Sequence, residues 1–536
     1  MEQLRRFIFG TAAAAAFWCG AAELKLPESA AGTVSAEPGK PFSCVVEVEP
    51  EAFYRLEAEQ NTAAGGSEMS GILRSAEGRW LFQYFGIPES EAPRRLVAKI
   101  CTPAGGRKLE IRLESSTGQA EFSGVRLEKV ERGEIRNGAS MEFWLNMDYF
   151  DEVYYSEKLG SPSYAEKEIA HFFRLCRERG VTGVFWRISV HGQVAYHSRG
   201  AATVFPGPVP VEQLDEGRRK VAAVLGEIDP LAVAVREARR NGIRIMIWMT
   251  LSDEAILHPS IPDFCMSEFQ RANRHTMLMD RRGRVLPGTM CYNEPEALQY
   301  RLAMIRELIG YGADGFYLCT RSHSHQFGSD SGDDYGFNPA VVAEYRRLYG
   351  KDIRTEEFDV GKWRQIKTQG YDRLLREASA LIHGAGQKLV LGVAAATLSN
   401  GTILGNYGKT PFPWEENLRA GRLDGIVSGQ YMVSDYFASR EYNRFSLVAK
   451  PGQKLFFWAQ VYHYGMCRSF TARELLRQAG TFAFLNPGGG VLYHEAMNFE
   501  EDEAGLFNFS GRGGSESCPV YCPAATGPSF CCICWV

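Results

Sequence analysis

Eight short apolar runs, separated by helical patterns, constrain the fold of this chain more than any other feature. Each run is too short for a helix and ends at turn or polar residues, which is typical of buried parallel strands. The residues between them have helix signals, such as Asp229 followed by Pro230. This alternation predicts a (β/α)8 TIM barrel over residues 138–510, with its own core. The predicted strands are Phe143–Met147, Val184–Ile188, Arg244–Met249, Phe316–Cys319, Lys388–Val393, Gly425–Ser428, Leu455–Ala459 and Gly490–Tyr493.

The region before the barrel, residues 23–137, has the pattern of an all-β domain. Apolar and polar residues alternate in Val45–Val48 and Leu109–Leu113, and turn residues separate such runs. Short alternating strands predict a β-sandwich. The segment Ala120–Leu127 is typical of the closing strand of a jelly roll. A carbohydrate-binding role and a purely structural role both remain open, because a fold does not determine a function.

The two ends of the chain differ from these domains. Residues 1–22 begin with Arg5 and Arg6, then an apolar run, then small residues. This order predicts a secretory signal peptide and an exported, periplasmic or extracellular bacterial protein. No later stretch is apolar for long enough to predict a membrane span. Residues 511–536 are rich in cysteine and show no strand or helix period, which fits either a disordered tail or an artefact of the gene model.

Composition excludes several function classes. The 536 residues carry a formal net charge of −4, without the basic excess expected of a nucleic-acid partner. The sequence has no Gly-rich phosphate loop, dinucleotide fingerprint or serine nucleophile elbow, so no cofactor is expected. His323 and His325, with Asp330, could suggest a metal site. Because imidazoles two residues apart point to opposite sides of an extended segment, we expect hydrogen bonding there and no metal.

The segment Tyr311–His325 is the most suggestive place for chemistry. The buried run Phe316–Cys319 opens directly into Arg321, His323 and His325. Barrel enzymes present their reactive groups in this way, on the loops that follow the strands.

Several segments resemble the family-10-like glycosyl hydrolases, bacterial barrel hydrolases related to the α-amylase and α-galactosidase group. The resemblance covers roughly residues 140–500 and implies hydrolysis of O-glycosyl bonds in a carbohydrate substrate. The chain departs from the family at the end of the fourth strand, where an acidic residue is typical and Cys319 stands here. The segments that carry the resemblance are Asp229–Ala232, Cys291–Glu296, Tyr311–Cys319, Gly336–Pro339, Val341–Gly350 and Thr355–Asp359.

Glycoside cleavage needs two carboxyl groups, one to protonate the leaving oxygen and one to act as base or nucleophile. Glu495 is the first choice, because it follows a Gly- and Val-rich strand. Glu294 is more simply explained by helix capping, since Pro295 follows it. The candidate catalytic residues are Glu495, Asp148, Glu254 and Asp330, with Asp253, Asp333, Asp334 and Asp435 as further carboxylates. Asp148 is also explained as an acid that binds a substrate hydroxyl or has a structural role.

Substrate binding is expected from polar and aromatic residues near the strand ends. Arg321 could pair with an acidic sugar. Trp414, placed in a loop, is a better stacking platform for sugars than aromatics within strands, which are more often core. The candidate substrate-binding residues are Arg187, Trp248, Asn293, Tyr317, Arg321, His323, Trp414, Gln430, Tyr431, Gln460, His463 and His494.

The main hypothesis is therefore an exported glycoside hydrolase that uses paired carboxylates. Two alternatives stay open. Cys319 at the fourth strand end favours a non-catalytic glycan-binding protein on a degenerate barrel. A hydrolase of another bond could use His323 or His494 as its base.

Overall fold

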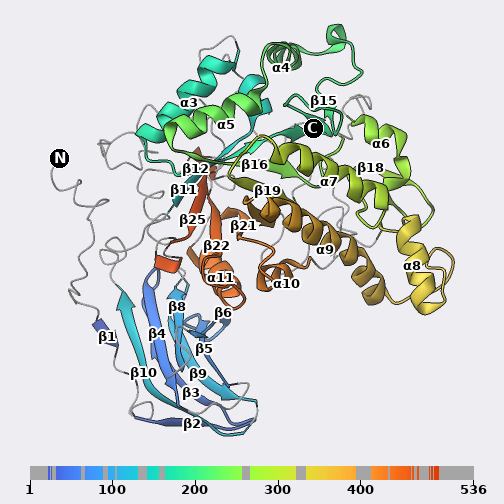
Figure 1. Cartoon of the computed structure of the whole chain (residues 1–536). Coiled ribbons are helices and arrows are strands. Elements are labelled where there is room, and N and C mark those ends of the chain that lie inside the picture. The colour runs from blue at the N-terminus through green and yellow to red at the C-terminus, as the bar shows by residue number, and fades with distance from the viewer. Residues whose placement is uncertain are drawn as a thin grey trace. The chain divides into compact units, whose positions relative to one another are not determined.

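A computed structural model describes most of both predicted domains (Figure 1). The residues that it describes are 22–24, 26, 32–61, 67–88, 94–102, 105–116, 118–130, 142–154, 156, 163–255, 266–320, 334–393, 412–432, 435–459, 462–463, 468–469, 482, 484–486 and 488–493.

The second half of the chain forms a closed barrel of eight parallel strands, so the predicted (β/α)8 barrel is confirmed. All eight predicted strands are present, with ends that differ by a few residues. In barrel order they are β11 (Glu142–Met147), β12 (Gly183–Arg187), β16 (Arg244–Thr250), β19 (Gly315–Cys319), β20 (Lys388–Val393), β21 (Gly425–Met432), β22 (Lys454–Ala459) and β25 (Gly490–Tyr493).

Large side chains fill the barrel interior. Trp144 of β11 stacks on Phe185 of β12, with ring centroids 4.8 Å apart, and Phe185 contacts Tyr317 of β19 at 4.5 Å. Since side chains alternate along a strand, every second residue of each strand points into this core. The buried interior cluster comprises Trp144, Phe185, Met246, Trp248, Tyr317, Cys319, Val390, Val427, Phe456 and Trp458.

Helices join the barrel strands. The predicted cap of one is confirmed, because the Asp229 carboxylate accepts from the Ala232 backbone N–H at 3.2 Å and Pro230 takes the first helical position. The helices are α2 (Tyr149–Tyr154), α3 (Glu166–Glu178), α4 (Glu216–Glu227), α5 (Pro230–Asn241), α6 (Glu268–Ala272), α7 (Pro295–Ile309), α8 (Pro339–Tyr349), α9 (Val360–Gly384), α10 (Trp414–Arg419) and α11 (Asp435–Ser446), with 3₁₀ turns η4 (Val211–Gln213) and η5 (Arg274–Thr276).

Long connections follow β12 and β16 and contain small sheets of their own. The connection after β16 includes a hairpin, and the one after β12 includes a three-stranded sheet. These strands are β13 (Ser189–Val190), β14 (Gln193–Val194), β15 (Thr203–Val204), β17 (Met277–Met279) and β18 (Val285–Met290), and a further pair follows β22, β23 (Tyr462–His463) and β24 (Arg468–Ser469).

The first part of the chain folds as the predicted sandwich of two antiparallel sheets around a buried core. One sheet has the order β1-β10-β4-β8-β7, with β2 also on β10, and the other has the order β3-β9-β5-β6. The strands are β1 (Ala22–Leu24), β2 (Val34–Ala36), β3 (Phe42–Glu47), β4 (Phe53–Gln60), β5 (Ser67–Arg74), β6 (Trp80–Phe85), β7 (Ile87–Pro88), β8 (Arg94–Cys101), β9 (Lys108–Ser115) and β10 (Ala120–Val130).

The two compact units of the structure are not separated by one boundary at residue 137. The sandwich unit contains residues 1–141 together with 432–449 and 473–489, which interrupt the barrel's sequence. Helix α11 lies in this unit, and the Lys99 ammonium of β8 donates to the carbonyls of Phe484 and Leu485, both at 3.1 Å. Two segments that the sequence pattern assigns to the barrel therefore pack with the sandwich.

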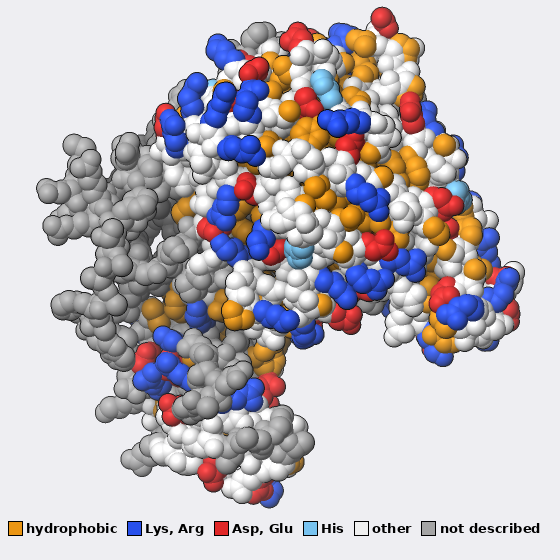
Figure 2. All heavy atoms as spheres, viewed as in Figure 1, with side chains coloured by type: hydrophobic (Ala, Val, Ile, Leu, Met, Phe, Trp, Pro, Cys, Tyr) orange, Lys and Arg blue, Asp and Glu red, His pale blue; other side chains and the backbone are white. Residues whose placement is uncertain are grey.

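The face of the molecule drawn in Figure 2 carries interspersed Lys, Arg, Asp and Glu side chains among apolar and neutral ones. In the described part of the chain, every helix is too short or too polar to cross a membrane.

Candidate active site at the carboxyl ends of the barrel strands

Three charged residues lie at the carboxyl ends of three neighbouring barrel strands. Asp148 directly follows β11, Arg187 ends β12, and Asp253 comes three residues after β16. These strands are adjacent in the barrel, with Met147 opposite Trp186 and Arg187 opposite Trp248. Parallel strands bring their carboxyl ends to one face, which is where barrel enzymes carry their active sites. We call Asp148, Arg187 and Asp253 the carboxylate–arginine cluster.

The Arg187 guanidinium joins the two acids. Its Nη1 donates to Asp148 Oδ2, its Nη2 donates to Asp253 Oδ2 at 2.5 Å, and its Nε donates to the Ser189 carbonyl at 3.0 Å. The guanidinium also faces the Trp248 ring, 5.3 Å from its centroid. Arg187 is 2% exposed, so its planar fork is fixed on all sides and orients both carboxylates.

The two aspartates of this cluster stabilise the protonated form of Arg187. Burial would lower the pKa of Arg187, but the nearby charges of Asp148 and Asp253 outweigh it and raise that pKa above its usual value. Arg187 therefore stays protonated between the two aspartates. Since Arg187 occupies an oxygen of each acid, the cluster is not arranged as a metal site.

A tight turn brings a histidine to the same cluster. His191 has a positive φ of 51° and lies between β13 and β14, with its Nδ1 3.1 Å from Asp253 Oδ1. The next residue, Gly192, has a φ of 78°, and a Cβ there would lie 2.4 Å from the Glu254 carbonyl oxygen. Only glycine fits this close approach, so Gly192 allows the turn that places His191.

Polar atoms without hydrogen bonds point into this end of the barrel. Asp148 Oδ1 is buried, and within the described structure nothing donates to it. Asn146, two residues earlier on β11 and 1% exposed, has neither amide atom hydrogen-bonded in that part of the chain. Buried polar groups are normally satisfied, so such atoms mark a place where a ligand or water would bind. Asn146 is not among the residues predicted from the sequence, although a polar residue in an apolar strand, two positions before Asp148, indicates it.

The side chain of Glu254, a predicted catalytic residue, pairs with Arg301. Its Oε1 forms an ion pair with Arg301 of α7, and both side chains are almost fully buried, at 3% and 0% exposure. Burial raises the pKa of Glu254, with the charge of Arg301 acting in the opposite direction. The pair links the connection after β16 to α7, and the catalytic role predicted for Glu254 stays a prediction.

The aromatic candidates are buried. Trp248 and Tyr317 belong to the interior cluster, with 1% and 0% exposure, and their rings contact at 5.9 Å. Trp414 is not a loop residue, because it begins α10 and is only 1% exposed. None of the three offers an open ring face for a sugar, and the predicted stacking platform at Trp414 is corrected on this ground.

Asn293 also lies away from the cluster. Its amide donates to the Ile366 carbonyl of α9 at 2.8 Å, and a Cβ on Gly370 would lie 2.6 Å from the Asn293 nitrogen. It lines a small cavity with Leu278, Cys291, Tyr292, Tyr335, Lys367 and Tyr371. These contacts make Asn293 part of the packing between α7 and α9, so its predicted role in substrate binding is not supported.

The fourth strand end carries no acid in the described structure. Cys319 is fully buried in the interior cluster. Thr320 follows it and donates its hydroxyl to the Gly392 carbonyl at 2.8 Å. Carboxylates for glycoside cleavage would therefore have to follow other strands or come after residue 320.

The remaining candidates lie wholly or partly outside the described residues. Gln430 and Tyr431 belong to β21, and His463 belongs to β23, opposite Arg468. The last strand, β25, pairs with β11 so that Tyr493 is opposite Leu145. Outside the described residues are Arg321, His323, Asp330, Gln460, His494 and Glu495.

Comparisons with known proteins connect the chain to glycosidases only distantly. A scan against models of protein families and a search of curated proteins gave no match. Among solved structures, the chain is similar to the PgaB (BpsB) glycoside hydrolase domain from Bordetella bronchiseptica. The two are 12% identical, with a TM-score of 0.43, over 69% of this chain and 98% of that one.

Two further structures show the same level of similarity. The catalytic domain of β-amylase from Paenibacillus polymyxa is 8% identical, with a TM-score of 0.42, over 70% of this chain and 97% of its own. The β-N-acetylhexosaminidase from Bacteroides fragilis NCTC 9343 is 8% identical, with a TM-score of 0.40, over 84% of this chain and 78% of its own. With TM-scores below 0.5, these similarities carry no functional argument, and the barrel assignment rests on the strand order itself.

Proposed function

We propose that the protein is an exported glycoside hydrolase that acts on a polysaccharide or oligosaccharide through paired carboxylates. The observation that carries the proposal is the carboxylate–arginine cluster at the active face of a closed (β/α)8 barrel. Resemblance to the family-10-like glycosyl hydrolases adds the reaction class. Glycosidase chemistry needs acids at the carboxyl ends of strands, and Asp148 is one such acid with an oxygen left for a substrate or water.

The second carboxylate in this proposal is Glu495. It follows β25 by two residues, and β25 pairs with β11, the strand that precedes Asp148. Acids that come directly after neighbouring parallel strands would suit the two roles that glycoside cleavage requires. Asp148, paired with Arg187, would act as the base or nucleophile, and Glu495 would protonate the leaving oxygen.

Arg187 and Asp253 would then position Asp148. Arg187 binds Asp148 and Asp253 at once, and His191 contacts Asp253 from the turn before β14. An acid bound by a buried arginine keeps one orientation. Catalytic groups work best when they are held in place before the substrate binds.

A non-catalytic glycan-binding barrel is the second candidate. The observation that favours it is Cys319, which occupies the interior where the family resemblance leads one to expect an acid. The hydrolase and the binding protein differ in turnover, so one experiment separates them.

The experiment is a screen of the full chain, with the predicted signal peptide removed, against a panel of soluble polysaccharides, with reducing ends as the readout. The proposal expects new reducing ends on at least one glycan. Glu495→Gln should lower that rate by about 10²-fold or more, because glutamine keeps the shape but cannot transfer a proton. Glu227→Gln, an exposed acid at the end of α4, is the matched control and should keep the wild-type rate. Binding without products on every glycan would favour the second candidate.

The sandwich is proposed to bind the same class of glycan. Its edge strand β6 begins with Trp80, which is 53% exposed, whereas most of the large aromatic side chains in the described residues are buried. An exposed tryptophan can stack on a sugar ring. Trp80→Ala should weaken retention of the full chain on the insoluble form of its substrate while leaving cleavage of a short soluble substrate unchanged. Equal retention of both proteins would contradict this role.

A further inference from the structure

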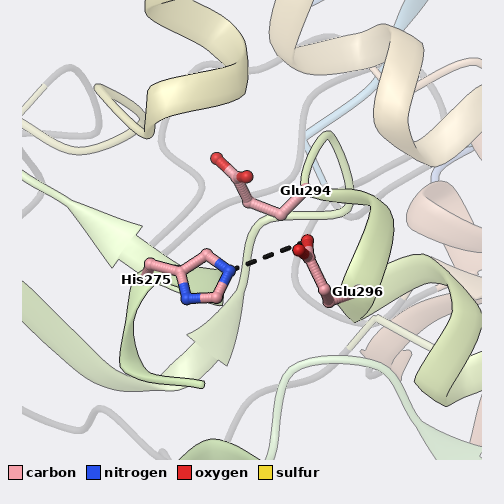
Figure 3. A group of neighbouring side chains, drawn as sticks. All are labelled: His275, Glu294 and Glu296. Carbon is pink, nitrogen blue, oxygen red and sulfur yellow. Dashed lines mark ion pairs between the residues drawn. The ribbon is translucent and has the colours of Figure 1, made fainter.

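Three possible metal ligands lie together at the start of α7, outside the carboxylate–arginine cluster. They are His275 of η5, Glu294 at the N-cap of α7 and Glu296 in its first turn (Figure 3). One ligand atom from each lies within 4.8 Å of the other two. The His275 Nε2 and Glu296 Oε2 atoms are 3.7 Å apart. Ligand atoms around a tetrahedral zinc ion are about 3.2–3.5 Å apart, so small side-chain movements would close this group on an ion.

The scaffold behind these residues is rigid. Asn338, at the N-cap of α8 and fully buried, donates its amide to the carbonyls of His275 at 2.9 Å and Met277 at 2.7 Å. The next helical residues of α8 hold Glu294, because the Ala340 backbone N–H donates to Glu294 Oε1 at 2.9 Å. The start of α8 thus holds both the backbone of His275 and the carboxylate of Glu294.

Glu294 is the buried member of the group. It is 5% exposed, and the Ala340 backbone N–H donates to its Oε1. A carboxylate has more acceptor positions than this one hydrogen bond uses, so it can still bind an ion. A carboxylate largely shielded from water is stabilised by a cation beside it.

Helix capping alone does not explain this group. Acidic residues in the first turn interact favourably with the helix dipole, and Glu296 needs no other reason to be there. The dipole accounts for neither the histidine, which comes from a separate 3₁₀ turn, nor the burial of Glu294, whose hydrogen bond goes to a different helix.

We propose that His275, Glu294 and Glu296 bind a divalent transition-metal ion of the zinc type. One imidazole and two carboxylates suit such an ion, whereas Ca²⁺ takes six to eight oxygen ligands and Mg²⁺ prefers an octahedral set of oxygens. The two carboxylates supply two negative charges to balance it. Three protein ligands leave a position for water. The ion would fasten η5 and the hairpin after β16 to the start of α7.

The site is independent of the proposed glycosidase activity, and its test measures binding. The full chain, stripped with EDTA and then freed of it, is titrated with Zn²⁺ by calorimetry, and with Co²⁺ by absorption. The wild-type protein should bind one equivalent of Zn²⁺ at this site. In His275→Ala and in Glu296→Gln the affinity for that equivalent should be at least about 100-fold weaker. That equivalent should show no thiolate band with Co²⁺, which separates it from any ion bound by cysteines.

Two controls keep the result interpretable. Glu216→Gln removes an exposed first-turn acid from α4 and His171→Ala removes an exposed histidine from α3, and neither should change the titration. Glu294→Gln keeps an oxygen for Ala340 and should weaken binding without unfolding the chain in EDTA. Zn²⁺ titrations of His275→Ala and Glu296→Gln that match wild type, or an equal loss in Glu216→Gln, would overturn the proposal.

Discussion

Arg187 Nη2 donates to Asp253 Oδ2 over 2.5 Å, and the same guanidinium binds Asp148 through Nη1. All three residues are at most 9% exposed. One guanidinium therefore binds a carboxylate from each of two different connections, and the orientation of each of the three side chains depends on the others.

Replacing Arg187 should show this dependence in stability. Arg187→Lys keeps a positive charge but cannot bind both carboxylates, so one acid stays buried without its partner. We expect a loss of about 3–5 kcal/mol in the free energy of unfolding, measured by chemical denaturation. Arg240→Lys is the control, because Arg240 is 65% exposed and its partner Glu237 is also bound by Arg236. It should change stability by about 0.5 kcal/mol or less. Similar losses in both variants would show that the cluster is not tightly coupled.

Gly192→Ala tests the turn that carries His191. Both Gly192 and Gly242 have positive φ, 78° and 67°, but only at Gly192 would a new Cβ meet backbone, 2.4 Å from the Glu254 oxygen. Gly242→Ala should cost about 1–2 kcal/mol from its left-handed conformation alone. Gly192→Ala should cost about 1–3 kcal/mol more, because the chain must move to relieve the clash. Thermal and denaturant unfolding measure both variants, and equal losses would contradict the described path of the turn.

Glu57 in the sandwich should make stability depend on pH. It is 3% exposed on β4 and is bound by Arg55, Arg95 and Arg126. Burial would raise the pKa of Glu57, but the hydrogen bonds from Arg95 and Arg126 outweigh it and lower that pKa.

A carboxyl group with a lowered folded-state pKa stabilises above its unfolded pKa, about 4.3, and loses this contribution as pH falls toward its folded value. Glu57→Gln should therefore cost on the order of 1–3 kcal/mol near neutral pH, with the difference from wild type shrinking below about pH 4.3. Glu47→Gln, exposed on β3, is the control. A difference that stays constant from pH 7 to low pH would contradict this assignment.

Fragments made by dividing the chain at residue 137 should fold poorly. The sandwich unit includes 432–449 and 473–489, and Phe53 contacts Phe484 with ring centroids 5.3 Å apart. A fragment of residues 23–137 lacks these partners, and one of residues 138–510 carries them without the sheet. We expect both to bind a hydrophobic dye and to aggregate in size-exclusion chromatography, unlike the full chain. Monomeric fragments that do not bind the dye would show that the two segments are dispensable to both units.

The barrel could be predicted because its signal is local. Each strand is an apolar run bounded by turn residues, and Asp148 and Arg187 stand directly at strand ends, where direction follows from alternation alone. The position of Asp229 before Pro230 likewise predicted the start of α5 correctly.

Other features of the site depend on contacts between residues that are distant in the sequence. Glu254 and Asp253 are neighbours, and only the path of the connection decides which of them meets Arg187 and which meets Arg301, 47 positions away along the chain. The prolines at 411 and 413 favour a loop around Trp414, yet Trp414 begins a helix and is buried. Likewise, no local pattern in α11 indicates that it packs with the sandwich, since an amphipathic helix does not specify its partner.

The most direct test of the account compares two aspartates at opposite ends of the barrel. Asp148 follows β11, whereas Asp424 precedes β21 and is bound by His383 at 2.7 Å and Lys388 at 2.9 Å. On the glycan found in the screen, kcat/KM per folded molecule should fall by about 10²-fold or more in Asp148→Asn and remain at the wild-type value in Asp424→Asn. Wild-type kcat/KM in Asp148→Asn would contradict the proposed active site.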